Sequence, residues 1–218
     1  MINRQFHAIG DSHVSFFTGR DEIAQGYPIV NNSDLGWVST VHYIGASTAA
    51  ALVYPASDGR QRLFSVLNSL PQTDPIILVF GEIDCRVHLS QNGNSVTPER
   101  AAQNYLRCIR QVEGFGYDVY VWGVICPLFD DERRKERYAE RGARLAREQA
   151  MREFNGALHE ALKSKLINIS GRVARNPEYF FDGLHLNQKA MEFCHEGFKR
   201  RLDSYHCRTG DCAGDCSA

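Results

Sequence analysis

The feature that most constrains the fold is a run of five apolar residues, Ile76 to Phe80, between Pro75 and Gly81. Apolar and polar residues do not alternate in this run, so a strand built from it has both faces buried. Strands of this kind are typical of parallel sheets that carry helices on both faces. We therefore expect an α/β core built around this strand.

Strand-like and helix-like segments alternate along the rest of the chain. The expected strands are Gln5–Ile9, Trp37–Ile44, Ile76–Phe80, Asp118–Ile125 and Leu166–Ile169. The expected helices cover residues 60–70, 97–114, 130–165 with a break at Gly142, and 187–203. Residues 18–36 are rich in turn formers and are expected to be a surface loop. The alternation predicts a doubly wound parallel sheet of about five strands.

Length and charge set the class of protein. A chain of 218 residues is long enough for one compact domain, and we expect this domain to span residues 1–206. The formal net charge of -1 favours neither nucleic acid nor an anionic membrane as a partner. No apolar run approaches the roughly 18 residues of a membrane helix. The first residues lack an apolar signal region, so a cytoplasmic protein is expected.

The last residues, 207–218, form a tail rich in cysteine, glycine and aspartate. Its three thiols, Cys207, Cys212 and Cys216, could form a disulfide or hold a metal. Three thiols without a paired Cys-x-x-Cys are a weak zinc signal, however. We expect a frayed terminus with reduced thiols and no metal site.

The residues that indicate chemistry lie near the two ends of the chain. Ser12 follows the first expected strand in the sequence Gly10-Asp11-Ser12, and Asp182 precedes His185 by three residues. A serine hydroxyl is a poor nucleophile unless a base takes its proton, and a carboxylate orients that base. The hypothesis is a serine hydrolase or acyltransferase with Ser12 as nucleophile, His185 as base and Asp182 as orienting group. The alternative is that Ser12 only caps a helix.

Four short blocks occur in an order that resembles the SGNH (GDSL-type) hydrolase superfamily: Gly10-Asp11-Ser12, Gly45, Gly81-x-x-Asp84 and Asp182-x-x-His185. The resemblance spans nearly the whole chain. It implies a flavodoxin-like three-layer α/β/α fold, no metal or other cofactor, and ester hydrolysis or acyl transfer through an acyl-serine. It also implies an oxyanion hole built from the backbone N–H groups of Ser12 and Gly45.

The third block departs from the pattern of this family. The family usually shows Gly-x-Asn-Asp, whereas this chain reads Gly81-Glu82-Ile83-Asp84. Ile83 cannot donate a hydrogen bond from its side chain, and losing one oxyanion donor can cost about 10²–10³ in rate. Arg86 is the candidate substitute, held by Glu82 or Asp84. The alternative is an ordinary ion pair at a strand end.

Three further residues near these blocks are expected to have structural roles. His13 is expected to form a pocket wall, because adjacent side chains rarely point the same way. Cys85 and Cys126 are expected to pack in the interior, because no base lies beside them in the sequence.

Three functions remain open at this point. The first is an esterase that removes an O-acyl group, with O-acetyl as the leading expectation, from a carbohydrate or related small molecule. The second is an O-acyltransferase with the same triad, and the third is a weakly catalytic SGNH-like binding protein. The substrate depends on loops 18–36, 87–96 and 127–142, which carry no readable signature. The sequence leaves the oligomeric state open.

Overall fold

The computed structural model describes residues 4–32, 37–91 and 95–194 of the chain. These residues contain one six-stranded sheet with the order β2-β3-β1-β4-β5-β6. Its strands are β1 Arg4–Gly10, β2 Ile29–Asn32, β3 Trp37–Tyr43, β4 Ile76–Val79, β5 Val119–Trp122 and β6 Leu166–Ile167. All neighbouring strands are parallel except β2, which runs antiparallel to β3. The predicted parallel α/β sheet is confirmed.

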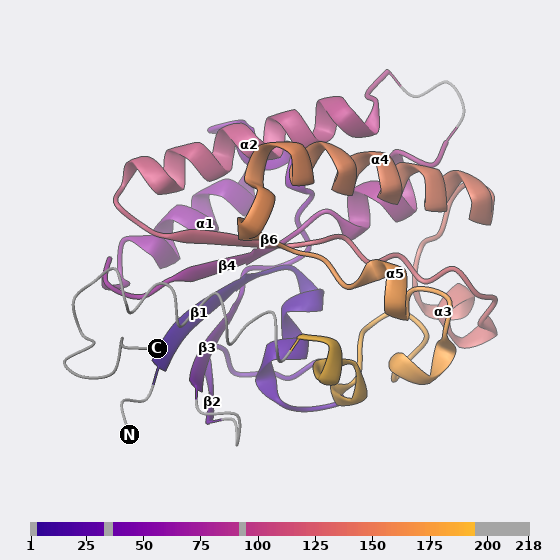
Figure 1. Cartoon of the computed structure of the whole chain (residues 1–218), viewed down its shortest axis with the longest axis horizontal. Helices are drawn as coiled ribbons and strands as arrows, with labels where there is room; N and C mark the ends of the chain where they lie inside the picture. Colours follow the sequence, from indigo (N-terminus) through magenta and orange to yellow (C-terminus); the bar gives the residue numbers. More distant parts are fainter. Residues whose placement is uncertain (1–3, 33–36, 92–94, 195–218) are drawn as a thin grey trace, which may run out of the picture.

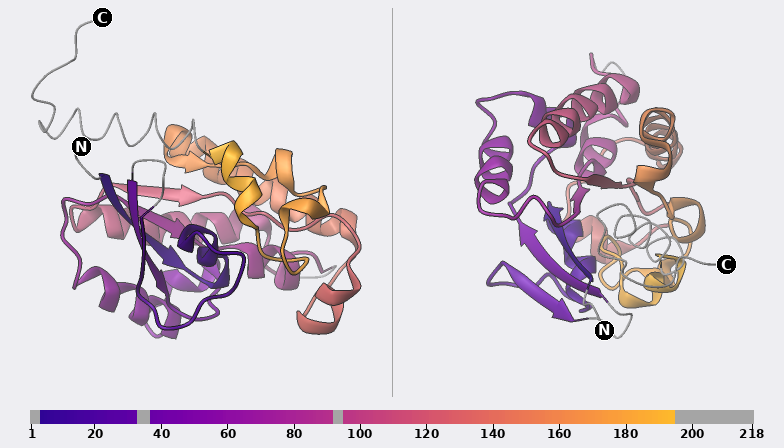
Figure 2. Two further views of the ribbon diagram at one scale, coloured as in Figure 1. Left: turned by 90° about the horizontal axis from the view of Figure 1, so that it is seen from below. Right: turned by 60° about the vertical axis from the view of Figure 1, so that its left-hand side comes forward.

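Helices lie on both sides of this sheet, which gives three layers (Figure 1). The α-helices are α1 Asp58–Leu67, α2 Pro98–Gly114, α3 Glu132–Arg137, α4 Arg144–Leu162 and α5 Ser170–Val173. Short helical turns are η1 Ser12–Thr18, η2 Ala49–Val53, η3 Asp84–His88, η4 Lys163–Lys165, η5 Pro177–Tyr179 and η6 Gln188–Met191. The further views in Figure 2 show the same layering from two other sides. The expected three-layer α/β/α architecture is confirmed.

Strand β4 and helix α2 form where the sequence predicts them. All four residues of β4 are buried, so the unbroken apolar run forms a central strand covered on both faces. Helix α2 begins where Thr97 caps it: Thr97 Oγ1 accepts a hydrogen bond from Arg100 N at 3.3 Å. Pro98 occupies the first turn, where its missing N–H has no partner to lose.

One strand was missed by the sequence prediction. Residues 18–36 were expected to be a surface loop, but Ile29–Asn32 forms the edge strand β2. Exposure alternates along β2, because an edge strand needs only one covered face. Its four residues pair with Val38–Val41 of β3. The flanking glycine, proline and asparagine residues dominated the sequence signal and concealed this short alternation.

The long helical stretch 130–165 divides into α3 and α4. Residues 138–143 between them are not helical, and Gly142 has a φ of 74°. A Cβ atom at Gly142 would lie 2.1 Å from the carbonyl oxygen of Ser90, so only glycine fits this approach. The predicted break at Gly142 is confirmed.

Two predictions concern residues outside the described ranges. Of the helix expected over 187–203, the described part contains the 3-10 turn η6 at Gln188–Met191 and then ends at residue 194. The tail 207–218, with Cys207, Cys212 and Cys216, and the domain boundary at residue 206 both lie outside the described residues. Among the described helices, none is long and apolar enough to cross a membrane.

The parallel topology brings the predicted blocks to one edge of the sheet. Strands β1, β3, β4 and β5 end just before Ser12, Gly45, Glu82 and Cys126 respectively. In an open parallel sheet, ligands bind beyond the carboxyl ends of the strands. This edge is therefore where a site is expected.

Candidate active site

Ser12 lies in a tight turn between β1 and η1. Gly10 allows β1 to end against β4, since a Cβ atom there would lie 2.3 Å from the carbonyl oxygen of Val79. Asp11 caps η1, because its Oδ1 accepts a hydrogen bond from His13 N at 2.9 Å. The capping residue of this turn is thus Asp11, which leaves the Ser12 hydroxyl available for another contact.

The Ser12 hydroxyl contacts a histidine 173 residues away in the sequence. Ser12 Oγ lies 2.8 Å from His185 Nε2, and His185 Nδ1 lies 2.8 Å from Asp182 Oδ2. A proton on Nδ1 makes Nε2 the acceptor for the serine hydroxyl. The structure thus brings together all three residues that the sequence singled out for nucleophile, base and orienting group.

Asp182 is held by four donors. Its Oδ1 accepts hydrogen bonds from the backbone N–H groups of Leu184 at 3.0 Å and His185 at 2.8 Å. Its Oδ2 accepts from Tyr138 Oη at 2.8 Å, besides its contact with His185. These contacts hold the pKa of Asp182 well below its usual range, against the opposing effect of burial.

His185 is almost completely buried, with 1% of its surface exposed. Burial disfavours the imidazolium ion and lowers the pKa of His185 below 6.5, although Asp182 acts in the opposite direction. The ring is therefore neutral at neutral pH and able to accept a proton. The neighbouring ring of His13 lies 4.7 Å away, centroid to centroid.

Gly45 follows β3 and lies beside the turn that carries Ser12. The backbone N–H of Ile44 donates to Gly10 O at 3.0 Å and ties the two segments together. Gly45 has a φ of 90°, a conformation that favours glycine. An ideal Cβ atom there would lie 2.5 Å from the Arg62 guanidinium, so the flexible Arg62 side chain would have to shift.

Solved structures with the same architecture include esterases and a lipase. The chain aligns over 93% of its length, with a TM-score of 0.60 and 16% identity, to 99% of the M. smegmatis aryl esterase. A carbohydrate acetylesterase from Sinorhizobium meliloti aligns over 93% of this chain and 99% of its own, with a TM-score of 0.57 and 17% identity. A GDSL-like lipase from Bacteroides thetaiotaomicron aligns over 92% and 88%, with a TM-score of 0.58 and 13% identity.

The fold is that of the SGNH (GDSL-type) hydrolases. Searches with family models and against curated proteins give no match, so the likeness to known proteins is one of fold. The expected fold is thereby confirmed.

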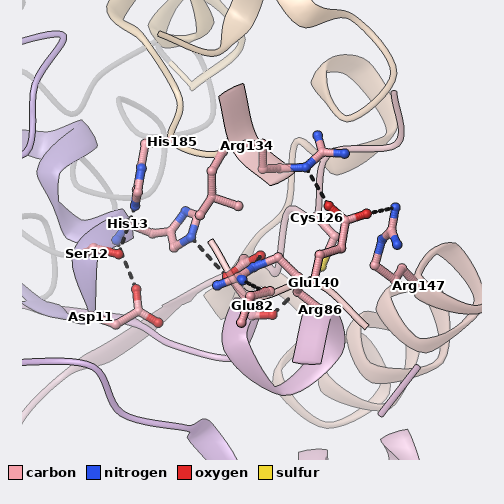
Figure 3. Close-up of polar contacts among 12 residues, drawn as sticks. Asp11, Ser12, His13, Glu82, Arg86, Cys126, Arg134, Glu140, Arg147 and His185 are labelled. Carbon is pink, nitrogen blue, oxygen red and sulfur yellow. Dashed lines mark hydrogen bonds and ion pairs between the residues drawn. The ribbon is translucent and has the colours of Figure 1, made fainter. Parts of the chain in front are cut away.

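In the third block, this chain has no asparagine, and charged or titratable side chains lie beside the asparagine position. Ile83 stands at the asparagine position and precedes η3. Beside it, Glu82 Oε2 lies 3.3 Å from His13 Nε2, and Glu82 Oε1 accepts from Arg86 Nε at 2.6 Å (Figure 3). The Glu82 side chain is 4% exposed, so a buried chain of polar contacts leads from Arg86 through Glu82 to His13, the residue after Ser12. His13 was expected from the sequence to be a pocket wall only, but its side chain also contacts Glu82.

Arg86 has the partner that the sequence predicted. Besides Glu82, its guanidinium donates to the carbonyl oxygen of Ala139, and the residue is 7% exposed. The pKa of Glu82 falls to about 2, because contacts with His13 and Arg86 outweigh burial. Direct donation from Arg86 to an oxyanion stays a prediction.

Asp84 does not share in this chain of polar contacts. Its two carboxylate oxygens accept from the backbone N–H groups of Ala49 at 2.7 Å and Ala50 at 3.1 Å. Asp84 is 2% exposed and holds the start of η2, just after Gly45. These contacts give Asp84 a structural role and leave Glu82 as the only described acidic partner of Arg86.

The cysteines and acidic groups of the described residues offer no other site. Cys85 and Cys126 are free and buried, and burial raises the pKa of Cys85 well above its usual value. Buried thiols of this kind are inert. Both cysteines pack in the interior, as expected from the sequence. Within residues 4–32, 37–91 and 95–194, no three histidine, cysteine or acidic side chains are grouped to hold a metal ion.

Asp11 gives a prediction about stability. Its carboxyl group is fully buried with Glu82 nearby, and these effects raise its pKa to about 8 despite the hydrogen bond from His13 N. The folded protein keeps this proton up to about pH 8, whereas the unfolded chain releases it near the ordinary pKa of 3.8. Stability should therefore fall as pH rises between these values, with this group contributing up to about 1.4 kcal/mol per pH unit.

The Asp11→Asn variant isolates this contribution, because an amide has a similar shape and does not titrate. Urea unfolding of both proteins at several pH values between about 5 and about 8 measures it. We expect the variant to gain stability relative to the wild type as pH rises. Parallel stability curves would show that Asp11 is already ionised in the folded protein.

Proposed function

We propose that this protein is a serine esterase that removes an O-acyl group, with O-acetyl as the first candidate, from a carbohydrate or related small molecule. The observation that carries the proposal is the contact of Ser12 Oγ with His185 Nε2 at 2.8 Å, with Asp182 on the other ring nitrogen. This arrangement lies at the carboxyl edge of the sheet, where open α/β folds bind ligands.

In the proposed reaction, Ser12 Oγ attacks the carbonyl carbon of the ester while His185 Nε2 takes the hydroxyl proton. Asp182 keeps the imidazole in the required tautomer and stabilises the imidazolium ion. His185 then returns the proton to the leaving alcohol, and the acyl group remains on Ser12. A water molecule, deprotonated by His185, releases the acid and restores the free serine.

The negative charge on the tetrahedral intermediate requires hydrogen-bond donors. The backbone N–H groups of Ser12 and Gly45 are the proposed pair, since the N–H of Ile44 ties the two segments together. Ile83 supplies no third side-chain donor. The proposed enzyme therefore relies on two backbone donors and on the field of the ion pair between Arg86 and Glu82.

The acyl group is proposed from the neighbours in structure. A carbohydrate acetylesterase and an acetyl xylan esterase share the fold, the second over 90% of this chain with a TM-score of 0.55 and 15% identity. An acetyl ester on a sugar combines a small acyl group with a polar alcohol. We propose this combination as the substrate class.

The test is a panel of p-nitrophenyl acetate, butyrate and octanoate, together with acetylated xylan. We expect turnover of the acetate to exceed that of the octanoate, and acetate release from the sugar ester. Addition of a sugar alcohol separates the alternatives, because an acyltransferase would form a new ester instead of free acid. If no ester turns over and a fluorophosphonate probe leaves Ser12 unlabelled, the protein is a binding module.

A further inference from the structure

A short segment between α3 and α4 contacts the triad. We call residues 138–142 the strap. Tyr138, its first residue, donates a hydrogen bond from Oη to Asp182 Oδ2 at 2.8 Å. The ring of Tyr138 stands edge-on to the His185 ring, with centroids 5.4 Å apart and planes at 74°. Asp182 Oδ2 is thus shared between Tyr138 and the proposed base.

Arg86 and Ser90, which follow the third block in the sequence, fix the backbone of the strap. Arg86 donates from Nη1 to Ala139 O, and the Arg86 carbonyl accepts from Arg141 N at 3.2 Å. Ser90 Oγ donates to Arg141 O at 2.6 Å. The strap therefore lies along η3 and the residues that follow it.

A buried ion network fixes the strap from its other side. Glu140 accepts from Arg134 Nε at 2.9 Å and pairs with Arg147 Nη2 (Figure 3). The side chains of Arg134 and Arg147 are 1% and 6% exposed. Arg134 also donates to Gly183 O at 3.1 Å, inside the loop between Asp182 and His185. The network thus joins the strap directly to the loop that carries the proposed base.

We propose that Tyr138 is a positioning residue of the triad, which fixes Asp182 and shares its Oδ2 with His185. The strap holds Tyr138 in this position. This proposal rests on the proposed function, in which His185 is the base. It assigns Arg86 a further task, because Arg86 holds the strap at Ala139. The strap and Arg86 thereby help to order the site.

The hydrogen bond from Tyr138 also affects the proton affinity of His185. A donor to Asp182 Oδ2 spreads the carboxylate charge and weakens its attraction for the imidazolium ion. Without this donor, Asp182 stabilises the imidazolium more strongly, so the pKa of His185 rises. The other charged or titratable groups near His185 are His13, Glu82 and Asp11. The variant leaves all of them in place.

The experiment compares the wild type with Tyr138→Phe, which removes one oxygen atom and keeps the ring. An NMR titration of the His185 imidazole, assigned with a His185→Gln variant, measures the pKa of His185 without any substrate. We expect this pKa to lie below 6.5 in the wild type and to rise by about half a unit to one unit in the variant. The acid limb of kcat/KM should move to higher pH by the same amount, with a plateau about 3- to 10-fold lower.

Tyr54→Phe is the matched control, because Tyr54 is 58% exposed and lies outside the described site. It should change neither the pKa of His185 nor the rate. The Glu140→Gln variant tests whether the strap holds Tyr138 in place. It should move the pKa of His185 in the same direction as Tyr138→Phe.

The outcomes separate the two proposals. An unchanged pKa of His185 in Tyr138→Phe overturns the role of Tyr138, whatever the activity. A raised pKa in a protein that hydrolyses no ester supports the coupling and refutes the proposed function. A loss of rate in Tyr138→Phe with no movement of the acid limb would show a packing role only.

Discussion

Replacing Ser12 by alanine should lower kcat by about 10⁴-fold or more for every ester that the wild type hydrolyses. The substitution removes Oγ, the atom that lies 2.8 Å from His185 Nε2, and leaves the base without a nucleophile to activate. It should change stability little, because Asp11 and not Ser12 caps η1. Steady-state rates with p-nitrophenyl acetate measure the first effect, and urea unfolding measures the second.

Ser15→Ala supplies the control within the same turn. Ser15 Oγ is buried without a hydrogen-bond partner among the described residues, so its removal should leave kcat unchanged. Mass spectrometry of the quenched wild type should detect an acyl group on the peptide that contains both serines. Trapping in Ser15→Ala and not in Ser12→Ala would assign the acyl group to Ser12. Turnover by Ser12→Ala at the wild-type rate would remove Ser12 from the mechanism.

The parts of the fold that could be predicted are those with a strong local signal. The apolar run that became β4 indicated burial on both faces, and burial on both faces indicated a parallel sheet. A parallel sheet then placed the ends of β1 and β4 at one edge. The contact between Ser12 and His185, 173 residues apart, was anticipated instead from their residue types and from the resemblance of the four blocks to the SGNH hydrolases.

The parts that could not be predicted depend on contacts without a local signal. Tyr138 lies in a stretch of alternating charges that is typical of a solvated helix face, yet its hydroxyl contacts Asp182, 44 residues away. Glu140 belongs to the same stretch, and its side chain, 13% exposed, lies between two buried arginines. Charge balance along a sequence does not distinguish exposed pairs from buried ones, because only the tertiary fold decides their exposure.

Glu82 is the second residue for which we expect a large effect, this time on stability. Its carboxylate is buried between Arg86 Nε and His13 Nε2. Lowering its pKa from 4.5 to about 2 corresponds to about 3 kcal/mol of stability. This stability is present above the unfolded pKa and is lost as pH falls through about 2. Removing one partner of a buried ion pair typically costs about 3–5 kcal/mol of stability, which is similar to the value from the pKa of Glu82.

A double-mutant cycle tests whether this cost arises from an unpaired charge. Glu82→Gln and Arg86→Met should each lower the free energy of unfolding by about 3–5 kcal/mol, because each leaves a buried charge without its partner. The double variant contains neither charge, so it should lose clearly less than the sum of the two. Urea unfolding of the four proteins at neutral pH gives these values.

The same four proteins separate stability from catalysis. If the charges near Ser12 favour the anionic intermediate, the double variant should recover stability without recovering kcat, and KM should change little. If Arg86 instead binds an acidic group of the substrate, KM should rise while kcat is kept. Additive losses of stability would contradict the pairing itself, because they would show that Glu82 and Arg86 stabilise the fold independently across their 2.6 Å contact.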